Sequence, residues 1–421
     1  MAGRRRRESV EEVASSRSGG GGGGGGGVTI SFNQPPPEGR PDASLDGAAL
    51  ALGHGTSPAR LLRERAILYT SYGEVFQADG TADRRDAGLP AALRAVPAAG
   101  GGTARLYKAT YAANDPNEDR HTLVVGEGFL FAGVWDGHGG WGASDFAERS
   151  VYQHFKAATQ KGFSSEPAFA HAYRSTDIHY LEQSRQRVED GVRPTDLFAG
   201  TCAVSAFIDL EARTICVSNL GDCRVVLGII EEGGLPRTIP LSWDHSADLE
   251  QERLRVREEH PGDHEATVNC GGDYGEPDDW RIKGVCAFTR SLGDFQMKDT
   301  AAATLYNTYT KGYKVVPRPG DARPGAANGE GPTKPYIINE PTFAQHDVAG
   351  ECFVIIACDG VWDEMSSEEA VARVNDVLAH SSLSSTPLCS QRLTLDQHPE
   401  TTFHCHFLRE SACVRSCVAC H

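Results

Sequence analysis

The sequence predicts an α+β fold in which helices flank both sides of a central antiparallel β-sandwich. Apolar, β-branched runs bounded by Gly, Asp and Asn recur through the chain and are typical of strands, as in "HTLVVGEGFLFAGVWD" and "ECFVIIACDG". Residues 142–160 and 167–189 carry apolar side chains at three- and four-residue intervals, which predicts helices. Strands followed by helices and then by further strands favour helices packed outside two sheets. A doubly wound α/β fold is the alternative, but a hairpin-like pair around residues 219–224 favours antiparallel pairing.

Composition divides the 421 residues into three regions. Residues 1–100 are rich in Gly, Arg and Pro and bury too little apolar surface to offset their chain entropy, so we expect them to be mostly disordered. Within them, residues 59–76 predict a short helix followed by a strand. Residues 101–378 form the predicted folded domain, with a Gly- and Pro-rich surface insertion at residues 299–334. Residues 379–421 show neither the two-residue period of a strand nor the 3.6-residue period of a helix, so we expect a disordered or aberrant tail.

Composition also limits the classes of partner. The net charge of −16 argues against nucleic-acid binding and is compatible with an enzyme that uses cations. No apolar run reaches the length of about 18 residues that a membrane span needs, and the N-terminus lacks the apolar core of a secretion signal. We therefore expect an intracellular monomer that binds no membrane. Its arginine cluster at residues 4–7 suits a nuclear or a mitochondrial address, so the expected location is cytoplasmic or nuclear, with the mitochondrial matrix as the alternative.

Acidic residues recur where the predicted strands end. They are Glu118 and Asp119 in "NDPNEDR", Asp136 in "WDGHGG", Asp222 in "SNLGDCR", and Asp359 with Asp363 in "ACDGVWDE". Asp136 and Asp359 each follow an apolar strand and precede a glycine, which lets a carbonyl or a water approach closely. Two hard divalent cations about 4 Å apart bind such oxygen ligands, hold a bridging hydroxide and clamp a phosphoryl group. The pattern therefore predicts metal-assisted phosphate hydrolysis, whereas each Asp-Gly alone also fits an ordinary turn.

Seven motifs occur in a fixed order along the predicted domain. They are "EDR", "VWDGHGG", "GTCAVSAF", "SNLGDCRVVLG", "LSWDHSADLEQERLRVREEHPG", "AFTRSLGDFQMK" and "FVIIACDGVWDEMSSEEAV". Together they resemble the metal-dependent Ser/Thr protein phosphatases of type 2C. Within that family, "YAANDPNEDR", the "EEHPG" run and the insertion before "KPYIINEPTF" are most similar to the pyruvate dehydrogenase phosphatase branch. The resemblance implies that phosphoserine or phosphothreonine in protein substrates is hydrolysed by a water or hydroxide bridging two Mg²⁺ or Mn²⁺ ions, with a third ion in some members.

The resemblance also implies roles for individual residues. Asp136 would bridge the two ions, and Glu118 with the carbonyl of Gly137 would complete the ligands of the second ion. Asp359 would bind the first ion. His138 would protonate the Ser or Thr leaving oxygen as the general acid.

Further residues would act around these ligands. Asp119 would hold metal-bound waters from outside the ligand shell. Asp222 ranks lower, because it would fix a turn that supports the site. Asp196 lies one residue out of register with a third-ion carboxylate, and Asp363 would reach such an ion through water. Many family members carry an Arg four residues before the metal-binding Glu; here that position is Asn114, as in the pyruvate dehydrogenase phosphatase branch, which leaves an Arg clamp on the phosphate in doubt.

A second departure lies after Met365. Family members have an Asp-Asn pair that leads into a final core strand and supplies a ligand of the first ion. No such pair precedes an apolar strand here, and Asp396 in "TLDQHPETT" has no strand pattern behind it. We therefore expect the last strand to be missing, through either a gene-model error or a real loss of the ligand. A working phosphatase is the favoured hypothesis, and a catalytically impaired pseudophosphatase that binds phosphoproteins or partner proteins is the alternative.

Overall fold

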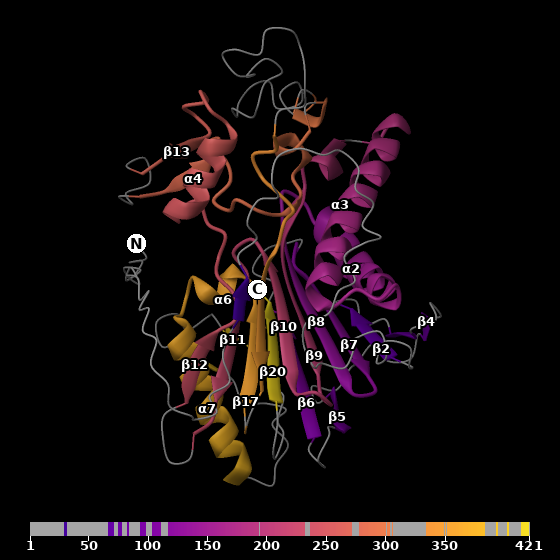
Figure 1. The fold of residues 1–421 in the computed structure, drawn as a ribbon, viewed down its shortest axis with the longest axis vertical. Helices are drawn as coiled ribbons and strands as arrows, with labels where there is room; N and C mark the ends of the chain where they lie inside the picture. Colours follow the sequence, from indigo (N-terminus) through magenta and orange to yellow (C-terminus); the bar gives the residue numbers. More distant parts are fainter. Residues whose placement is uncertain are drawn as a thin grey trace.

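Two β-sheets pack face to face, and helices cover both outer faces of the resulting sandwich (Figure 1). This arrangement confirms the predicted α+β sandwich and is not the doubly wound alternative. The computed structural model describes residues 29–31, 66–70, 75–77, 82–83, 93–97, 103–110, 117–192, 194–231, 236–271, 278–299, 301–303, 305, 334–348, 350, 352–383, 393–394, 402–403 and 414–420.

The larger sheet is antiparallel at each of its pairings. Its strand order over the described residues is β1-β16-β10-β9-β8-β7-β2-β3-β4, with β15 paired to β9. The bounds are β1 (Thr29–Ser31), β2 (Ala66–Thr70), β3 (Val75–Gln77), β4 (Ala82–Asp83), β7 (Arg120–Gly126), β8 (Phe129–His138), β9 (Gly200–Asp209), β10 (Thr214–Leu220), β15 (Leu292–Gly293) and β16 (Thr342–Asp347).

The smaller sheet has the order β12-β11-β17-β20-β6-β5 over the described residues. Its strands are β5 (Leu93–Pro97), β6 (Thr103–Thr110), β11 (Arg224–Ile229), β12 (Arg237–Pro240), β17 (Cys352–Ala357) and β20 (Val414–Cys420). Strand β20 runs parallel to both of its neighbours, β17 and β6. The expectation that the last strand is missing is therefore corrected. The segment "VRSCVAC" has only two β-branched residues, but pairing on both sides satisfies its backbone groups.

Helices cover the outer face of each sheet, as Figure 1 shows. Helices α2 (Gly142–Gln160) and α3 (Ser165–Glu189) confirm the two predicted helices and pack on the larger sheet through Phe131, Trp135, Phe155, Phe169 and Tyr173. Helix α7 (Ser367–Leu383) packs on β11 and β12 of the smaller sheet. Among the described residues, no helix combines the length and the apolar character needed to cross a bilayer.

The chain crosses from one sheet to the other at residues 221–223. The sequence predicts a hairpin here, and that prediction is wrong: β10 pairs with β9 and β16, whereas β11 pairs with β12 and β17. Gly221 has a φ of 113°, which favours glycine, and its neighbour Cys223 is fully buried. A Gly-Asp turn between two apolar runs has the same local sequence in both arrangements, so only packing distinguishes them.

The remaining elements lie above the sandwich and at the two ends of the chain. Helix α4 (Glu250–Glu259) and β13 (Thr267–Asn269) lie above the sandwich (Figure 1), and they pack with β14 (Trp280–Ile282), which pairs with β13. Short helices are α6 (Asp359–Trp362), η2 (Pro194–Leu197) and η3 (Phe295–Met297), and β18 (Leu393–Thr394) pairs with β19 (Thr402–Phe403). The first hundred residues contribute β1 to β5. The helix predicted before β2, most of the insertion at 299–334, and Asp396 lie outside the described residues.

Candidate metal centre

Four acidic residues from distant parts of the chain meet at one end of the sandwich. They form the carboxylate cluster: Asp119, Asp136, Asp222 and Asp359. The strand register explains this approach, because Arg120 pairs with Trp135 and so places the preceding Asp119 next to the residue that follows Trp135. In the other sheet Arg224 pairs with Ala357, which places Asp222 near Asp359.

Strand alternation directs Asp136 into the space between the sheets. Along β8, Leu130, Ala132 and Val134 face the sandwich core, and Asp136 continues the same face one step beyond them. Its Oδ2 atom lies 3.9 Å from Sγ of Cys223, the last residue of the crossover. The end of β8 therefore meets the crossover between the two sheets at Asp136.

The distances within the cluster suit one shared cation. Asp136, Cys358 and Asp359 each have a ligand atom within 4.8 Å of the other two. The amide of Asp359 donates a hydrogen bond to Oδ2 of Asp136 at 3.5 Å. The thiol of Cys358 donates to Oδ2 of Asp119, also at 3.5 Å. Asp136 and Asp359, both expected as metal ligands, are thus adjacent, while Asp119 lies against the neighbouring thiol.

Burial and mutual repulsion shift the pKa values of these carboxylates upward. Burial raises the pKa of Asp136 well above its ordinary value, and the charges of the other cluster members, Asp359 foremost, raise it further. Burial followed by the charge of Asp359 raises the pKa of Asp222 to about 7. Burial is also the main cause that raises the pKa of Asp119 to about 6. Such repulsion is relieved by a positive charge, and an oxygen-rich donor set fits a hard divalent cation such as Mg²⁺ or Mn²⁺.

Gly137 lies where the backbone before β7 crosses β8. A Cβ at this position would overlap the carbonyl oxygen of Glu118 and lie 2.7 Å from Oγ of Ser144. The single proton of that hydroxyl is shared between the carbonyls of Glu118 and Trp141. Only glycine permits this approach, so the backbone of Glu118 is held against the residue that follows Asp136. That the Glu118 carboxylate and the Gly137 carbonyl bind a metal stays a prediction.

His138 is paired with a carboxylate that the sequence reasoning did not identify. Its Nε2 atom lies 2.8 Å from Oδ2 of Asp294, and its side chain is 28% exposed while that of Asp294 is 2% exposed. Burial lowers the pKa of His138, but the charge of Asp294 and the hydrogen bond to it outweigh burial, so the pKa is raised. The charges of Asp222 and Glu118 act in the same direction. The protonated form of the imidazole is therefore favoured beside the carboxylate cluster.

Asp294 is itself fixed by its surroundings. It follows β15 in the left-handed region, with a φ of 50°, and Ser291 Oγ donates to its Oδ2 at 2.6 Å. Burial raises the pKa of Asp294, but the charge of His138 and its hydrogen bond lower it more strongly. A Cβ at position 200 would overlap both His138 Nε2 and Asp294 Oδ2, so Gly200 is needed beneath the pair.

The weaker candidates lie in different surroundings. The carboxylate of Asp196, on η2, forms an ion pair with Arg187. The backbone carbonyl of Asp196 accepts a hydrogen bond from the hydroxyl of Tyr180 at 2.8 Å. Asp363 is exposed one turn after Asp359, and its charge acts on Arg224. Asp222 belongs to the cluster itself, closer to the predicted metal ligands than its rank in the sequence implies. Asn114 lies outside the described residues.

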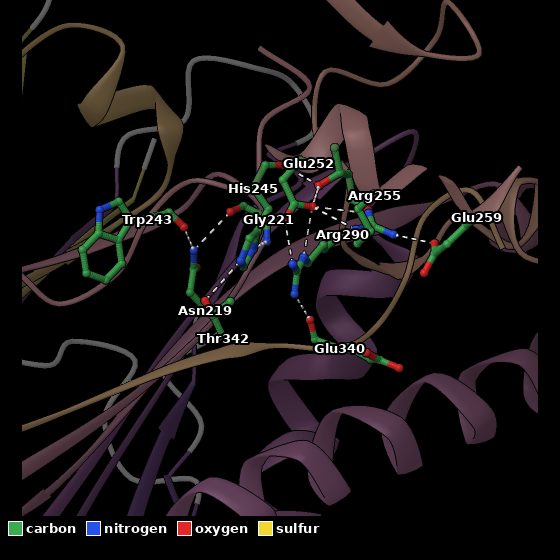
Figure 2. Close-up of polar contacts among 11 residues, drawn as sticks. Asn219, Gly221, Trp243, His245, Glu252, Arg255, Glu259, Arg290, Glu340 and Thr342 are labelled. Atoms are coloured by element: carbon green, nitrogen blue, oxygen red, sulfur yellow. Dashed lines mark hydrogen bonds and ion pairs between the residues drawn. The ribbon is translucent and has the colours of Figure 1, made fainter. Parts of the chain in front are cut away.

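A histidine holds the turn that carries Asp222 (Figure 2). The amide of Gly221 donates to Nδ1 of His245 at 3.0 Å, and Nε2 of His245 lies 3.1 Å from Oγ1 of Thr342. Because an amide can only donate, Nδ1 accepts, and the ring proton resides on Nε2. Burial, followed by the charge of Arg290, lowers the pKa of His245 to about 3, so the ring stays neutral. Asn219 completes the support by donating to the carbonyls of Gly221 and Trp243.

A buried ion pair joins helix α4 to the same region (Figure 2). Arg290 donates to Oε1 of Glu252 at 2.6 Å and to the carbonyl of Glu340 at 2.8 Å. The hydroxyl of Thr289 donates to Oε2 of Glu252 at 2.5 Å. Arg255 links Glu252 to Glu259 on the outer side. Helix α4 is thereby held beside the strand ends that carry the cluster.

Sequence reasoning identified most of the cluster but missed two supporting residues. Asp294 stands in "SLGDF" and His245 in "WDHSADL", both inside the quoted motifs. The signal was present in each case as a polar residue next to strand-like sequence. What the sequence lacked was the partner: His138 and Asp294 are 156 positions apart.

Comparisons with known proteins agree with the motifs. A family model described as "Protein phosphatase 2C" matches residues 125–401. The chain is 29% identical over 266 residues to "Probable protein phosphatase 2C 43" of Oryza sativa subsp. japonica, covering 63% of this chain and 62% of that protein. It is 30% identical over 269 residues to "Probable protein phosphatase 2C 68" of Arabidopsis thaliana, covering 62% of each. These matches thus span about 62% of the length of the relatives.

The fold aligns with "Crystal structure of serine-threonine phosphatase 2C from Toxoplasma gondii" at a TM-score of 0.44 and 20% identity, covering 70% of this chain and 88% of that one.

Proposed function

Because the chain belongs to the protein phosphatase 2C family, we propose that it is a metal-dependent protein serine/threonine phosphatase. The observation that carries the proposal is the buried carboxylate cluster with the His138–Asp294 pair beside it. The cluster offers oxygen donors to cations, and the pair offers a proton to a leaving group. These are the two requirements for hydrolysing an alkyl phosphate, whose leaving oxygen is strongly basic.

In the proposed reaction, the acidic residues would bind metal ions and His138 would donate a proton. Asp136, Asp359, Glu118 and the Gly137 carbonyl would hold two Mg²⁺ or Mn²⁺ ions, with Asp119 and Asp222 beside them. The bound ions supply Lewis-acid polarisation of the phosphoryl oxygens and lower the pKa of the attacking water. Water forms the new bond to phosphorus as the bond to the Ser or Thr oxygen breaks. His138 gives its proton to that oxygen, and Asp294 keeps its imidazole aimed and protonated beforehand.

The decisive test is hydrolysis of a phosphothreonine peptide by the purified chain, with Mn²⁺ against EDTA. Phosphate release that depends on Mn²⁺ and is lost in Asp136→Asn supports the proposal. No turnover by a folded chain contradicts it and favours the pseudophosphatase alternative. In that case binding of the intact phosphopeptide would be retained, which a pull-down with the same peptide measures.

We further propose that the substrate preference is that of the pyruvate dehydrogenase phosphatase branch. Asn114 in "YAANDPNEDR", the "EEHPG" run and the insertion at 299–334 support this proposal. A phosphoserine peptide taken from pyruvate dehydrogenase should then be hydrolysed with a kcat/KM at least about tenfold above that of an unrelated phosphopeptide, a difference of about 1.4 kcal/mol. Equal values would contradict the branch and leave the phosphatase activity standing.

The partners and the location are proposals of the same kind. We propose that the chain acts as a monomer on phosphoproteins, without nucleic acid or membrane, in the cytoplasm or nucleus, with the mitochondrial matrix as the alternative. The net charge of −16 supports a monomer that does not bind nucleic acid. Light scattering on the full chain tests the oligomeric state, and imaging of a fluorescent fusion tests the location.

A further inference from the structure

Two histidines face each other across the helical layer, and the proposed chemistry uses neither of them. His154 lies on α2 and His179 on α3, the two helices that pack side by side on the larger sheet (Figure 1). Nε2 of His154 lies 3.2 Å from Nδ1 of His179, and the ring centroids are 5.0 Å apart. His154 is half-buried and His179 is exposed. The two ring nitrogens therefore face each other where solvent can reach them.

The environment of His154 presets its ring as a ligand. Its Nδ1 lies 3.0 Å from Oγ1 of Thr176, which is 1% exposed. In the tautomer whose Nδ1 donates to Thr176, the lone pair of Nε2 faces His179. Burial, followed by the charges of His179 and His171, lowers the pKa of His154 to about 4. The ring is thus neutral at pH 7, and a cation need not displace a proton from it.

We propose that His154 Nε2 and His179 Nδ1 form a site for a borderline-soft divalent cation such as Zn²⁺, with water in the open positions. Two imidazoles of one tetrahedral Zn²⁺ have nitrogens about 3.3–3.4 Å apart, given Zn–N bonds of about 2.0–2.1 Å. The 3.2 Å separation here needs almost no rearrangement. Imidazole nitrogen prefers Zn²⁺, Cu²⁺ and Ni²⁺, whereas the carboxylate cluster prefers hard cations. The two sites therefore select different ions, and Zn²⁺ at the pair links α2 to α3.

The test counts Zn²⁺ ions bound to the full chain in equilibrium dialysis with saturating Mg²⁺. Wild type should bind one ion more than His179→Ala, whose exposed position makes it a mild substitution. The matched control is His171→Ala, because His171 also lies on α3 and its charge also reaches His154, yet it bonds to Ser175 instead of His154. His171→Ala should retain the wild-type number of ions.

A second variant tests the role of the hydrogen bond between His154 Nδ1 and Thr176. Thr176→Val removes the partner of His154 Nδ1 and should weaken Zn²⁺ binding about tenfold, as loss of such partners does in other metal sites. Zn²⁺ should also raise the melting temperature of wild type more than that of His179→Ala. Equal Zn²⁺ counts for wild type and His179→Ala would overturn the proposal, since the imidazoles then only bond to each other. Loss of the ion in His171→Ala would overturn it as well, because the ligand would lie elsewhere.

Discussion

Nε2 of His138 lies 2.8 Å from Oδ2 of Asp294, which joins the end of β8 to the turn that follows β15. Asp294 is almost fully buried, so its charge is poorly screened and acts chiefly on the imidazole. The pair raises the pKa of His138 despite the burial that lowers it. Asp294 is thus a positioning residue for the proton that the leaving group needs.

Asp294→Asn should therefore reduce turnover selectively. For a phosphothreonine peptide we expect kcat to fall about 10²-fold, because general acid catalysis contributes about 10²–10⁴-fold. For p-nitrophenyl phosphate kcat should change little, since nitrophenolate leaves without a proton. His138→Gln should show the same split between the two substrates. An equal loss on both substrates would show that Asp294 acts through the fold instead.

Gly200→Ala should disturb the same pair by steric overlap. The new Cβ would meet His138 Nε2 and Asp294 Oδ2, so the two side chains must separate. We expect a loss of about 1–3 kcal/mol in stability, as for other overpacked positions, together with a fall in kcat. The matched control is Gly228→Ala, whose Cβ would meet the Phe353 ring within the core. Urea unfolding should show a loss in both variants, whereas the kcat of folded Gly228→Ala should stay at the wild-type value.

Removing the metal should destabilise the chain through the carboxylate cluster. In EDTA, burial and the charges of Asp359 and Asp119 disfavour the ionised form of Asp136, which raises its pKa. Asp136→Asn removes the cost of ionising or protonating this buried group, so its melting temperature in EDTA should exceed that of wild type by about 2–4 °C, or about 1 kcal/mol. In saturating Mn²⁺ the order should reverse, because wild type then gains the binding energy of the ion. Differential scanning calorimetry measures the melting temperatures of both proteins under both conditions. A lower melting temperature of Asp136→Asn than of wild type in EDTA would contradict the prediction that Asp136 destabilises the metal-free chain.

Glu252 should make the stability of the chain depend on pH. Burial raises its pKa, but the hydrogen bond and the charge of Arg290 outweigh burial and lower the pKa to about 2, from 4.5. Because the pKa is depressed in the folded state, the stabilisation is fully present above 4.5 and is lost as the pH falls toward 2. The shift corresponds to about 3 kcal/mol.

Glu252→Gln should abolish most of that pH dependence. Urea unfolding of the variant between pH 3 and pH 6 should give a flatter profile than wild type, with lower stability at pH 6. Glu250→Gln is the control, because Glu250 is exposed in the first turn of the same helix. A steep profile in Glu252→Gln would assign the acid sensitivity to other groups.

Local patterns were sufficient for the elements whose burial is periodic. Apolar spacing in "GASDFAERSVYQHFKAATQ" predicts a helix over 142–160, and α2 has those bounds. The same reasoning failed at residues 219–224, where a Gly-Asp turn carries the chain between sheets instead of back along one. It also failed at β20, whose seven residues show neither a strand nor a helix period but pair with β17 and β6. In both cases the deciding hydrogen bonds join segments far apart in the chain.

The sequence by itself determined the kinds of residue available for chemistry. It placed Asp136 and Asp359 after apolar strands and glycine after each, and these local features survive any arrangement of the sheets. Only the tertiary structure decided that Asp119, Asp136, Asp222 and Asp359 form one cluster, that Asp294 holds His138, and that His154 meets His179. The physical reason is range: strand and helix periods follow from neighbouring residues, whereas charge repulsion, burial and hydrogen bonding act between groups that only the folded chain brings together.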